Sequence, residues 1–385
     1  MNSSMKRSFA VFALSVLLPA SAWAAGNIHM GPIEIHPYAS VKETWSDNIY
    51  STSVLEKSDT YTTVTPGLRL FMPFHTHEAG LEYNAVVNRY SKYYKEDTTD
   101  NNASGYLNFK FGSLVGLKLQ DVYAKGHEPR SSSSTGFIEK FKTNTANASV
   151  SYNLADISKI QIDYAATSWE FQNSTFRDRN EDMVSLYLFY RFLPKTSAFL
   201  EYDSKNVKFK DSDVLDNTVG SGFLGVTWEM SAQSRGTVKA GKLSKDFKNA
   251  GVPDFSGWAY SLDVQHQFSE YTSLQLVGQR AVNEANLLGT RYLISTGLFG
   301  EYRQRISHKF GGVVRGSYGK DVFSDAVGAP IAREDRTALK GAGLKYYMRD
   351  WLEFSADYNI KSRTSNLTAN NFDEHLYLIS VSMSL

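Results

Sequence analysis

Apolar and polar residues alternate with a two-residue period along most of this chain. The stretch WLEFSADYNIK is the clearest case, because Leu352, Phe354 and Tyr358 alternate with Glu353 and Asp357. The stretches WAYSLDVQHQF and SKIQIDYAAT repeat the pattern. A period of two predicts β-strands with one apolar face and one polar face.

The alternation divides into 18 segments, so the sequence predicts an all-β fold. We expect these strands to begin near Ile33, Thr60, Leu81, Ala103, Val115, Thr143, Ile160, Met183, Ser197, Val219, Gly236, Gly257, Ser273, Arg291, Lys309, Thr337, Trp351 and Phe372. Short connections such as FGSLVG and LPKTS follow the even-numbered strands. Longer polar connections such as KEDTTDNN and QNSTFRDRNED follow the odd-numbered ones. This segregation of loop lengths is typical of bacterial outer-membrane barrels, which have short periplasmic turns and long external loops.

The last segment, HLYLISVSMSL, keeps the alternation up to the carboxyl end of the chain. Free ends of soluble domains usually fray, whereas a membrane-spanning sheet must close so that every backbone group is paired. We therefore predict a transmembrane antiparallel up-and-down β-barrel of about 18 strands, with 16 as the alternative, and with both termini in the periplasm. Such a terminal strand also resembles the signal that outer-membrane assembly machinery reads, although that signal usually ends in an aromatic residue rather than Leu385.

The first 24 residues have the features of a secretory signal peptide. Lys6 and Arg7 precede an apolar run, and the small-residue site Ala22-Trp23-Ala24 follows it. This pattern predicts cleavage before Ala25, which leaves residues 25–385 as the barrel. The apolar run is too short to span a bilayer, so a membrane anchor is the less favoured interpretation.

Composition narrows the class of protein further. The chain has no cysteine, so disulfides cannot stabilise it, and 14% of its residues are aromatic. Its formal net charge of +1 becomes −1 once Lys6 and Arg7 are removed with the signal peptide. This near-neutral balance argues against a nucleic-acid partner. Export, many aromatic residues and no long apolar helix together favour the bacterial outer membrane as the location.

The N-terminal stretch carries a recognisable series of short motifs. Ser46-Asp47-Asn48-Ile49-Tyr50 is followed by Ser58-Asp59 and then by Thr65-Pro66-Gly67-Leu68. The series resembles the start of the putative beta-barrel porin type 2 family, whose members carry a tDNvy element, then sD, then PGL. The matching positions here are Asp47, Asn48, Asp59, Pro66, Gly67 and Leu68. The Tyr-rich second hairpin and the closing hairpin of this chain also resemble that family.

The resemblance implies a function. Members are often associated with exopolysaccharide assembly, so we expect a conduit that exports exopolysaccharide and contacts periplasmic or inner-membrane export components. Outer-membrane lipid and the outer-membrane assembly machinery are further expected partners. A general diffusion porin for small hydrophilic solutes and a structural or adhesion barrel are the alternatives.

Charged residues that alternate with apolar ones are candidates for the channel lining. They are Glu82, Lys118, Asp163, Arg191, Glu201, Asp203, Lys239, Asp263, Glu301, Arg303, Lys309, Arg315, Glu353, Asp357 and Lys361. Acids and bases nearly match in this set, whereas an ion-selective channel would carry a ring of one sign. A mixed wall suits a large hydrated solute, although these charges could also simply neutralise one another.

Aromatic residues allow two interpretations. Tyr90, Tyr187, Phe189, Phe199 and Phe299 fall on inward positions, where they could stack on sugar rings. A bulge that shifts the register would return them to the lipid face, and we favour this second interpretation. The residues expected in the interfacial girdle are Trp228, Trp258, Trp351, Tyr292, Tyr302, Tyr346 and Tyr358.

We expect neither catalysis nor a cofactor. The histidines lack a nucleophile elbow, and His75 with His77 in one short turn gives only two possible metal ligands. The loops HEPRSSSSTGFIEKFK and KDVFSDAVGAPIARED are instead candidates for a constriction at the mouth of the barrel.

Overall fold

The fold is a single β-sheet closed into a barrel, seen in a computed structural model that describes residues 28–384 except 129–137, 156, 232 and 325–331. A short strand, β1 (Ile28–Met30), precedes the barrel. The barrel strands are β2 (Ile33–Ser46), β3 (Asp59–Phe74), β4 (His77–Tyr90), β5 (Thr98–Phe111), β6 (Val115–Glu128), β7 (Glu139–Ala155), β8 (Ser158–Phe171), β9 (Arg179–Leu193), β10 (Thr196–Phe209), β11 (Asn217–Ser231), β12 (Ser234–Phe247), β13 (Phe255–Ser269), β14 (Thr272–Asn283), β15 (Leu293–Arg305), β16 (Phe310–Phe323), β17 (Glu334–Arg349), β18 (Leu352–Ser365) and β19 (Phe372–Ser384). The prediction of 18 strands is confirmed.

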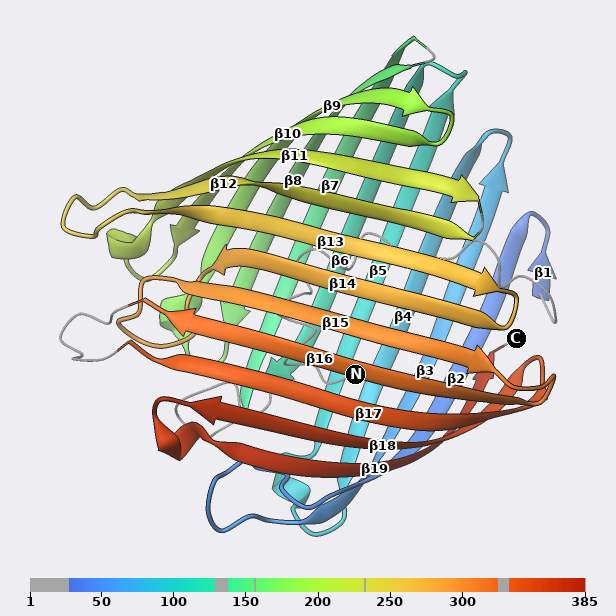
Figure 1. The fold of residues 1–385 in the computed structure, drawn as a ribbon, viewed down its shortest axis with the longest axis vertical. Coiled ribbons are helices and arrows are strands. Elements are labelled where there is room, and N and C mark those ends of the chain that lie inside the picture. The colour runs from blue at the N-terminus through green and yellow to red at the C-terminus, as the bar shows by residue number, and fades with distance from the viewer. Residues whose placement is uncertain (1–27, 129–137, 156, 232, 325–331, 385) are drawn as a thin grey trace.

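Each barrel strand pairs antiparallel with its neighbours in the sequence, and β19 pairs with β2 to close the sheet. Figure 1 shows β11–β19 crossing in front of β2–β9, with β1 and the C-terminus at the same end of the barrel. β1 extends the hairpin at the start of β2, where Ile28 pairs with Ile35. Closure leaves no free edge between β2 and β19, as a membrane-spanning sheet requires.

The two faces of the sheet separate by polarity. On β19, Tyr377 and Ile379 are exposed on the outside, whereas Glu374 and Leu376 are buried on the inside. On β10, Leu200 is exposed while its neighbour Glu201 is buried. Because successive strand residues point to opposite faces, each strand presents apolar side chains outward and mostly polar ones inward.

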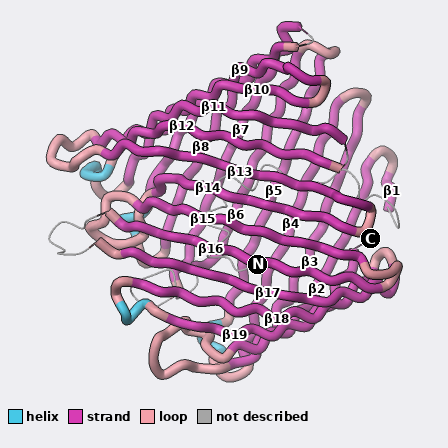
Figure 2. The backbone as a smooth tube through the Cα atoms, in the orientation of Figure 1, coloured by secondary structure: helices cyan, strands magenta, loops and turns pink. Residues whose placement is uncertain are grey.

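The connections differ between the two ends of the barrel. One end has tight turns, and the other has longer loops with the short 3₁₀ helices η1 (Tyr94–Glu96), η3 (Thr175–Arg177), η4 (Asp213–Leu215) and η5 (Thr368–Asn370) (Figure 2). The register shifts between strands fall beside the tight turns, as at Thr196/Ser197. No helix in the described residues is long and apolar enough to cross a membrane.

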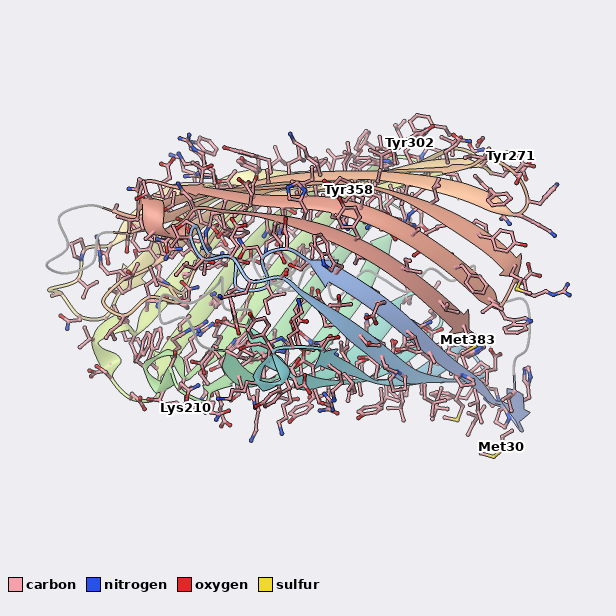
Figure 3. All side chains as sticks on the ribbon, turned by 90° about the horizontal axis from the view of Figure 1, so that it is seen from below. Met30, Lys210, Tyr271, Tyr302, Tyr358 and Met383 are labelled. Atoms are coloured by element: carbon pink, nitrogen blue, oxygen red, sulfur yellow. The ribbon has the colours of Figure 1, made fainter. Side chains whose placement is uncertain are left out.

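Aromatic rings cover the outside of the barrel. Tyr302 projects outward in Figure 3, and the rings of Trp45 and Tyr377 meet across the β2–β19 seam with centroids 5.4 Å apart. Tyr292 departs from the expected girdle. Its ring lies 4.9 Å from that of Phe255 and packs against a cluster of buried apolar residues, because the loop that carries it folds back over the sheet.

Candidate functional site

The inner face of the barrel is the candidate site, and its charges occur mainly in pairs. Arg69 lies 3.0 Å from Glu82, and Lys345 lies 2.7 Å from Glu353. Opposite charges at these distances neutralise each other locally, so they leave no strong electrostatic trap for a passing solute.

One of these networks spans four strands, from β15 to β18. Glu301 on β15 accepts from Arg303 and lies 3.4 Å from Arg315 on β16, which in turn bonds Asp357 on β18 at 2.8 Å. The intervening strand β17 allows this reach because it carries glycine at position 343, where a Cβ would lie 2.1 Å from the Asp357 carboxylate.

A second group combines charge with aromatic rings. Lys239 on β12 forms a buried ion pair with Glu201 on β10, and Tyr187 on β9 donates to the same carboxylate at 3.2 Å. Asp203 accepts from Ser221 at 3.2 Å. This group occupies the part of the inner wall formed by β9–β12.

The remaining predicted residues also lie on strands and alternate with outward apolar residues, with one exception. Gln161 donates to Asp163, and Lys361 pairs with Glu374 at 3.5 Å. The structure places three others on the same face without an ion pair among the described residues: Lys118, Arg191 and Asp263. Lys309 is the exception, because it lies in the tight turn between β15 and β16 rather than in a strand.

The favoured interpretation of the inward aromatic residues is wrong. Register is continuous from Ser197↔Arg191 to Phe209↔Arg179, so no bulge returns Tyr187, Phe189 or Phe199 to the lipid face. The rings of Tyr187 and Phe189 are stacked, with centroids 5.8 Å apart and nearly parallel planes, and the Lys159 ammonium lies 4.1 Å from the Phe189 ring. Phe199 fits there because Gly225 on the next strand lacks a Cβ, which would otherwise approach its ring to 2.3 Å. Tyr90 likewise stacks inside on Tyr61.

One loop folds back onto the inner wall. Residues 284–292, between β14 and β15, begin with Glu284, which forms a buried ion pair with Lys245 on β12. Asn217 on β11 donates to the same carboxylate at 3.5 Å, and Arg291 bonds the carbonyl of Pro253 at 2.9 Å. The loop therefore crosses the inner ends of β11–β13 and is the candidate constriction. No pattern in the sequence indicates this loop. The two predicted constriction loops lie largely in residues 129–137 and 325–331, outside the described residues.

No group of three or more His, Asp or Glu side chains in the described part of the chain could hold a metal ion. His77, one of the two histidines in the β3–β4 turn region, accepts from the Lys110 backbone N–H at 3.1 Å and packs on Phe109. These contacts give it a structural role.

Comparison with known proteins decides the family. Residues 22–385 match the family described as "Putative beta-barrel porin 2". This chain belongs to that family. No curated protein matches it.

Several solved structures from bacteria are similar to this porin. A BenF-like porin from Pseudomonas fluorescens Pf-5 is 10% identical with a TM-score of 0.51, over 91% of this chain and 99% of that one. OccAB4 of Acinetobacter baumannii is 12% identical (TM-score 0.48; 91% and 98% covered), and opdK of Pseudomonas aeruginosa is 10% identical (0.47; 91% and 99%). The protein is an outer-membrane β-barrel of the porin kind.

The motif residues of this porin stabilise the rim at the loop end. Asp47 accepts from the His375 backbone N–H at 2.8 Å, and Asn48 donates to the carbonyls of Thr52 and Asp373. Both contacts tie the end of β2 to the start of β19.

The PGL element has a different role. Pro66 lacks an N–H, and the pairing of β3 with β4 lapses at residues 65–66. Gly67 leaves room for the Tyr38 ring, which a Cβ would approach to 2.1 Å, whereas Leu68 is exposed on the outside. These motif residues shape the strand and its neighbours.

We expect Asp59→Ala to weaken the rim. The buried Asp59 carboxylate accepts from the backbone N–H groups of Thr60, Lys92 and Tyr93 at 2.8–3.1 Å. Leaving such donors unsatisfied should lower the free energy of unfolding by about 2 kcal/mol, measured by urea titration of the folded barrel. Asp59→Asn keeps an acceptor oxygen and should recover part of the loss; equal midpoints for the Ala variant and wild type would contradict this role.

One hydrogen-bonding arrangement recurs in four loops, and the sequence analysis does not predict it. In four loops, the backbone N–H of an aromatic residue that ends a strand donates to an aspartate seven residues later: Tyr90 to Asp97, Phe171 to Asp178, Phe209 to Asp216 and Phe247 to Asp254. Partial burial raises the pKa of the Asp178 carboxyl, against the lowering effect of the Phe171 hydrogen bond. The sequence pattern that indicates this arrangement is an aromatic residue followed seven positions later by aspartate, and it occurs in all four loops.

Proposed function

We propose that this porin conducts small hydrophilic solutes across the outer membrane by passive diffusion. A barrel of 16–18 strands encloses an aqueous channel. The observation that carries the proposal is the inner wall, where acids and bases are paired across strands, as in the network of Glu301, Arg315 and Asp357. A wall without a ring of one sign suits diffusion of polar solutes better than selection of one ion.

Export of exopolysaccharide is the second candidate, and one specific observation favours it. Tyr187 and Phe189 form a stacked pair of rings on the inner wall, and the Tyr187 hydroxyl donates to the Glu201 carboxylate. Flat aromatic surfaces next to hydrogen-bonding groups can contact sugar rings. In either case, we also propose that residues 1–24 are a signal peptide, which is removed when the chain is exported.

Two measurements separate the candidates. Purified barrels in liposomes should admit small sugars and amino acids, measured as swelling rates, and deletion of the gene should leave surface polysaccharide unchanged. Liposomes that stay impermeable, together with loss of surface polysaccharide in the deletion strain, would reject diffusion in favour of export.

A further inference from the structure

A row of basic side chains crosses the outside of the barrel near its loop end. Arg280 on β14 pairs in register with Thr296 on β15, which pairs with Lys320 on β16, which pairs with Arg336 on β17. The row faces outward, because two side chains on the same face of the sheet are exposed. These are Tyr260, which pairs with Arg280, and Tyr318, which lies two residues before Lys320 on β16. Three bases thus lie within four neighbouring strands.

Lys242 adds a fourth base to this row. It lies opposite Trp258, one step nearer the loops, with its ammonium 5.5 Å from the indole ring. Arg280 bonds the Trp258 carbonyl at 3.0 Å and the Thr296 hydroxyl at 3.3 Å. We call Lys242, Arg280, Lys320 and Arg336 the basic row.

The basic row has an excess of positive charge. Glu334 pairs with Lys320 at 2.9 Å and with Arg336 at 2.7 Å. Lys242 and Arg280 form no ion pair among the residues that the structure describes. Four bases against one acid leave an excess of three charges (4 − 1 = 3) at a position that meets the bilayer.

The surface below the row is mostly apolar, although Lys340 is exposed on the same face of β17 between Arg336 and Leu344. Leu298 is 51% exposed and Leu344 is 65% exposed, both nearer the middle of their strands than the basic row. A single lysine or arginine on a lipid-facing surface can snorkel its charge to the interface without binding anything. Here four bases are aligned across six strands, β12–β17, and an apolar strip lies below them. This arrangement matches one kind of ligand, a lipid with an anionic headgroup and acyl chains beneath it.

We propose that the basic row binds the phosphate groups of a phosphorylated membrane lipid, whose acyl chains lie along the apolar strip. Long loops face outward in outer-membrane barrels, so the lipid belongs to the outer leaflet. Arginine and lysine donors bind phosphate oxygens through charge-assisted hydrogen bonds. The lipid would hold β12–β17 together from outside, independently of what the channel conducts.

The test uses the full-length folded barrel in phosphatidylcholine nanodiscs with and without phosphatidic acid, which carries a phosphate monoester. Native mass spectrometry then measures how many lipids of each kind stay bound. Wild type should retain phosphatidic acid in preference to phosphatidylcholine. The variant Lys242→Gln/Arg280→Gln/Lys320→Gln should lose that preference, by about fivefold for each charge removed, since an interfacial cation contributes about 1 kcal/mol.

A control removes two lysines from loops instead, one charge fewer than the basic-row variant: Lys57→Gln/Lys95→Gln should retain the preference. Lys242→Arg should also retain it, because the charge is preserved. The proposal is overturned if wild type shows no preference, or if the basic-row variant and the loop variant bind alike. It is also overturned if inorganic phosphate alone displaces the bound lipid, because the site would then recognise a free anion.

Discussion

Replacing Glu284 by Gln should raise the single-channel conductance of the barrel. Glu284 neutralises Lys245, whose side chain is completely buried on the inner wall. Removing one partner of a buried ion pair costs about 3–5 kcal/mol, because the other charge stays buried and unpaired. Release of residues 284–292 from the wall and away from the channel mouth relieves this cost without unfolding any strand, so the constriction should open. Planar-bilayer recordings measure the change.

The control replaces the whole pair. Lys245→Leu/Glu284→Leu removes both charges and places apolar side chains near Val219 and Leu243, which are already buried in a local cluster. Such replacements are often neutral or stabilising, so this variant should conduct like wild type. Should Glu284→Gln lower the unfolding midpoint while leaving conductance unchanged, the loop would be a structural brace and not a constriction.

Leu119→Arg should largely prevent insertion of the barrel into a bilayer. Leu119 is exposed on the outward face of β6, in register with Leu107 and Ala148. A lipid-facing arginine near the bilayer midplane costs about 2–4 kcal/mol. Refolding into phosphatidylcholine vesicles, followed as the difference in gel mobility between unheated and boiled samples, measures the folded fraction.

The neighbouring position provides the matched control. Gln120 faces inward between Tyr106 and Asn147, where an arginine meets polar groups. Gln120→Arg should therefore fold nearly as well as wild type. Equal defects in the two variants would mean that the inner and outer faces of β6 are assigned wrongly.

The sequence predicted the barrel well because the physical rule behind it is local. A strand between lipid and water must alternate, so Leu352 to Tyr358 identify one strand without knowledge of any other. The predicted strand starts are farthest from the observed ones after long loops, as at Ala103, where β5 begins at Thr98. The prediction for Lys309 has the opposite error, because it places a turn residue in a strand. A polar residue next to a strand can continue the alternation by chance.

The candidate site was predictable only in part. Alternation assigns Glu201 and Lys239 to one face, but their pairing depends on the register between β10, β11 and β12. Glu284 contacts a lysine 39 positions earlier, and no local pattern indicates such a pair. For Tyr187 and Phe199, alternation gave the right face, and the assumption that aromatic residues prefer lipid overrode it. Gly225 explains the inward ring, because an adjacent glycine makes space for it.

We expect the seam between β2 and β19 to form last when the barrel folds. All other pairs of neighbouring barrel strands are joined by one turn or loop, so each can form as a local hairpin. The seam instead joins Trp45 to Tyr377, from nearly opposite ends of the chain. The entropic cost of closing a loop grows with its length, and contacts distant in sequence slow folding. Cylinder closure is therefore the one strongly non-local step, and the indole of Trp45 is an intrinsic fluorophore placed where that step completes.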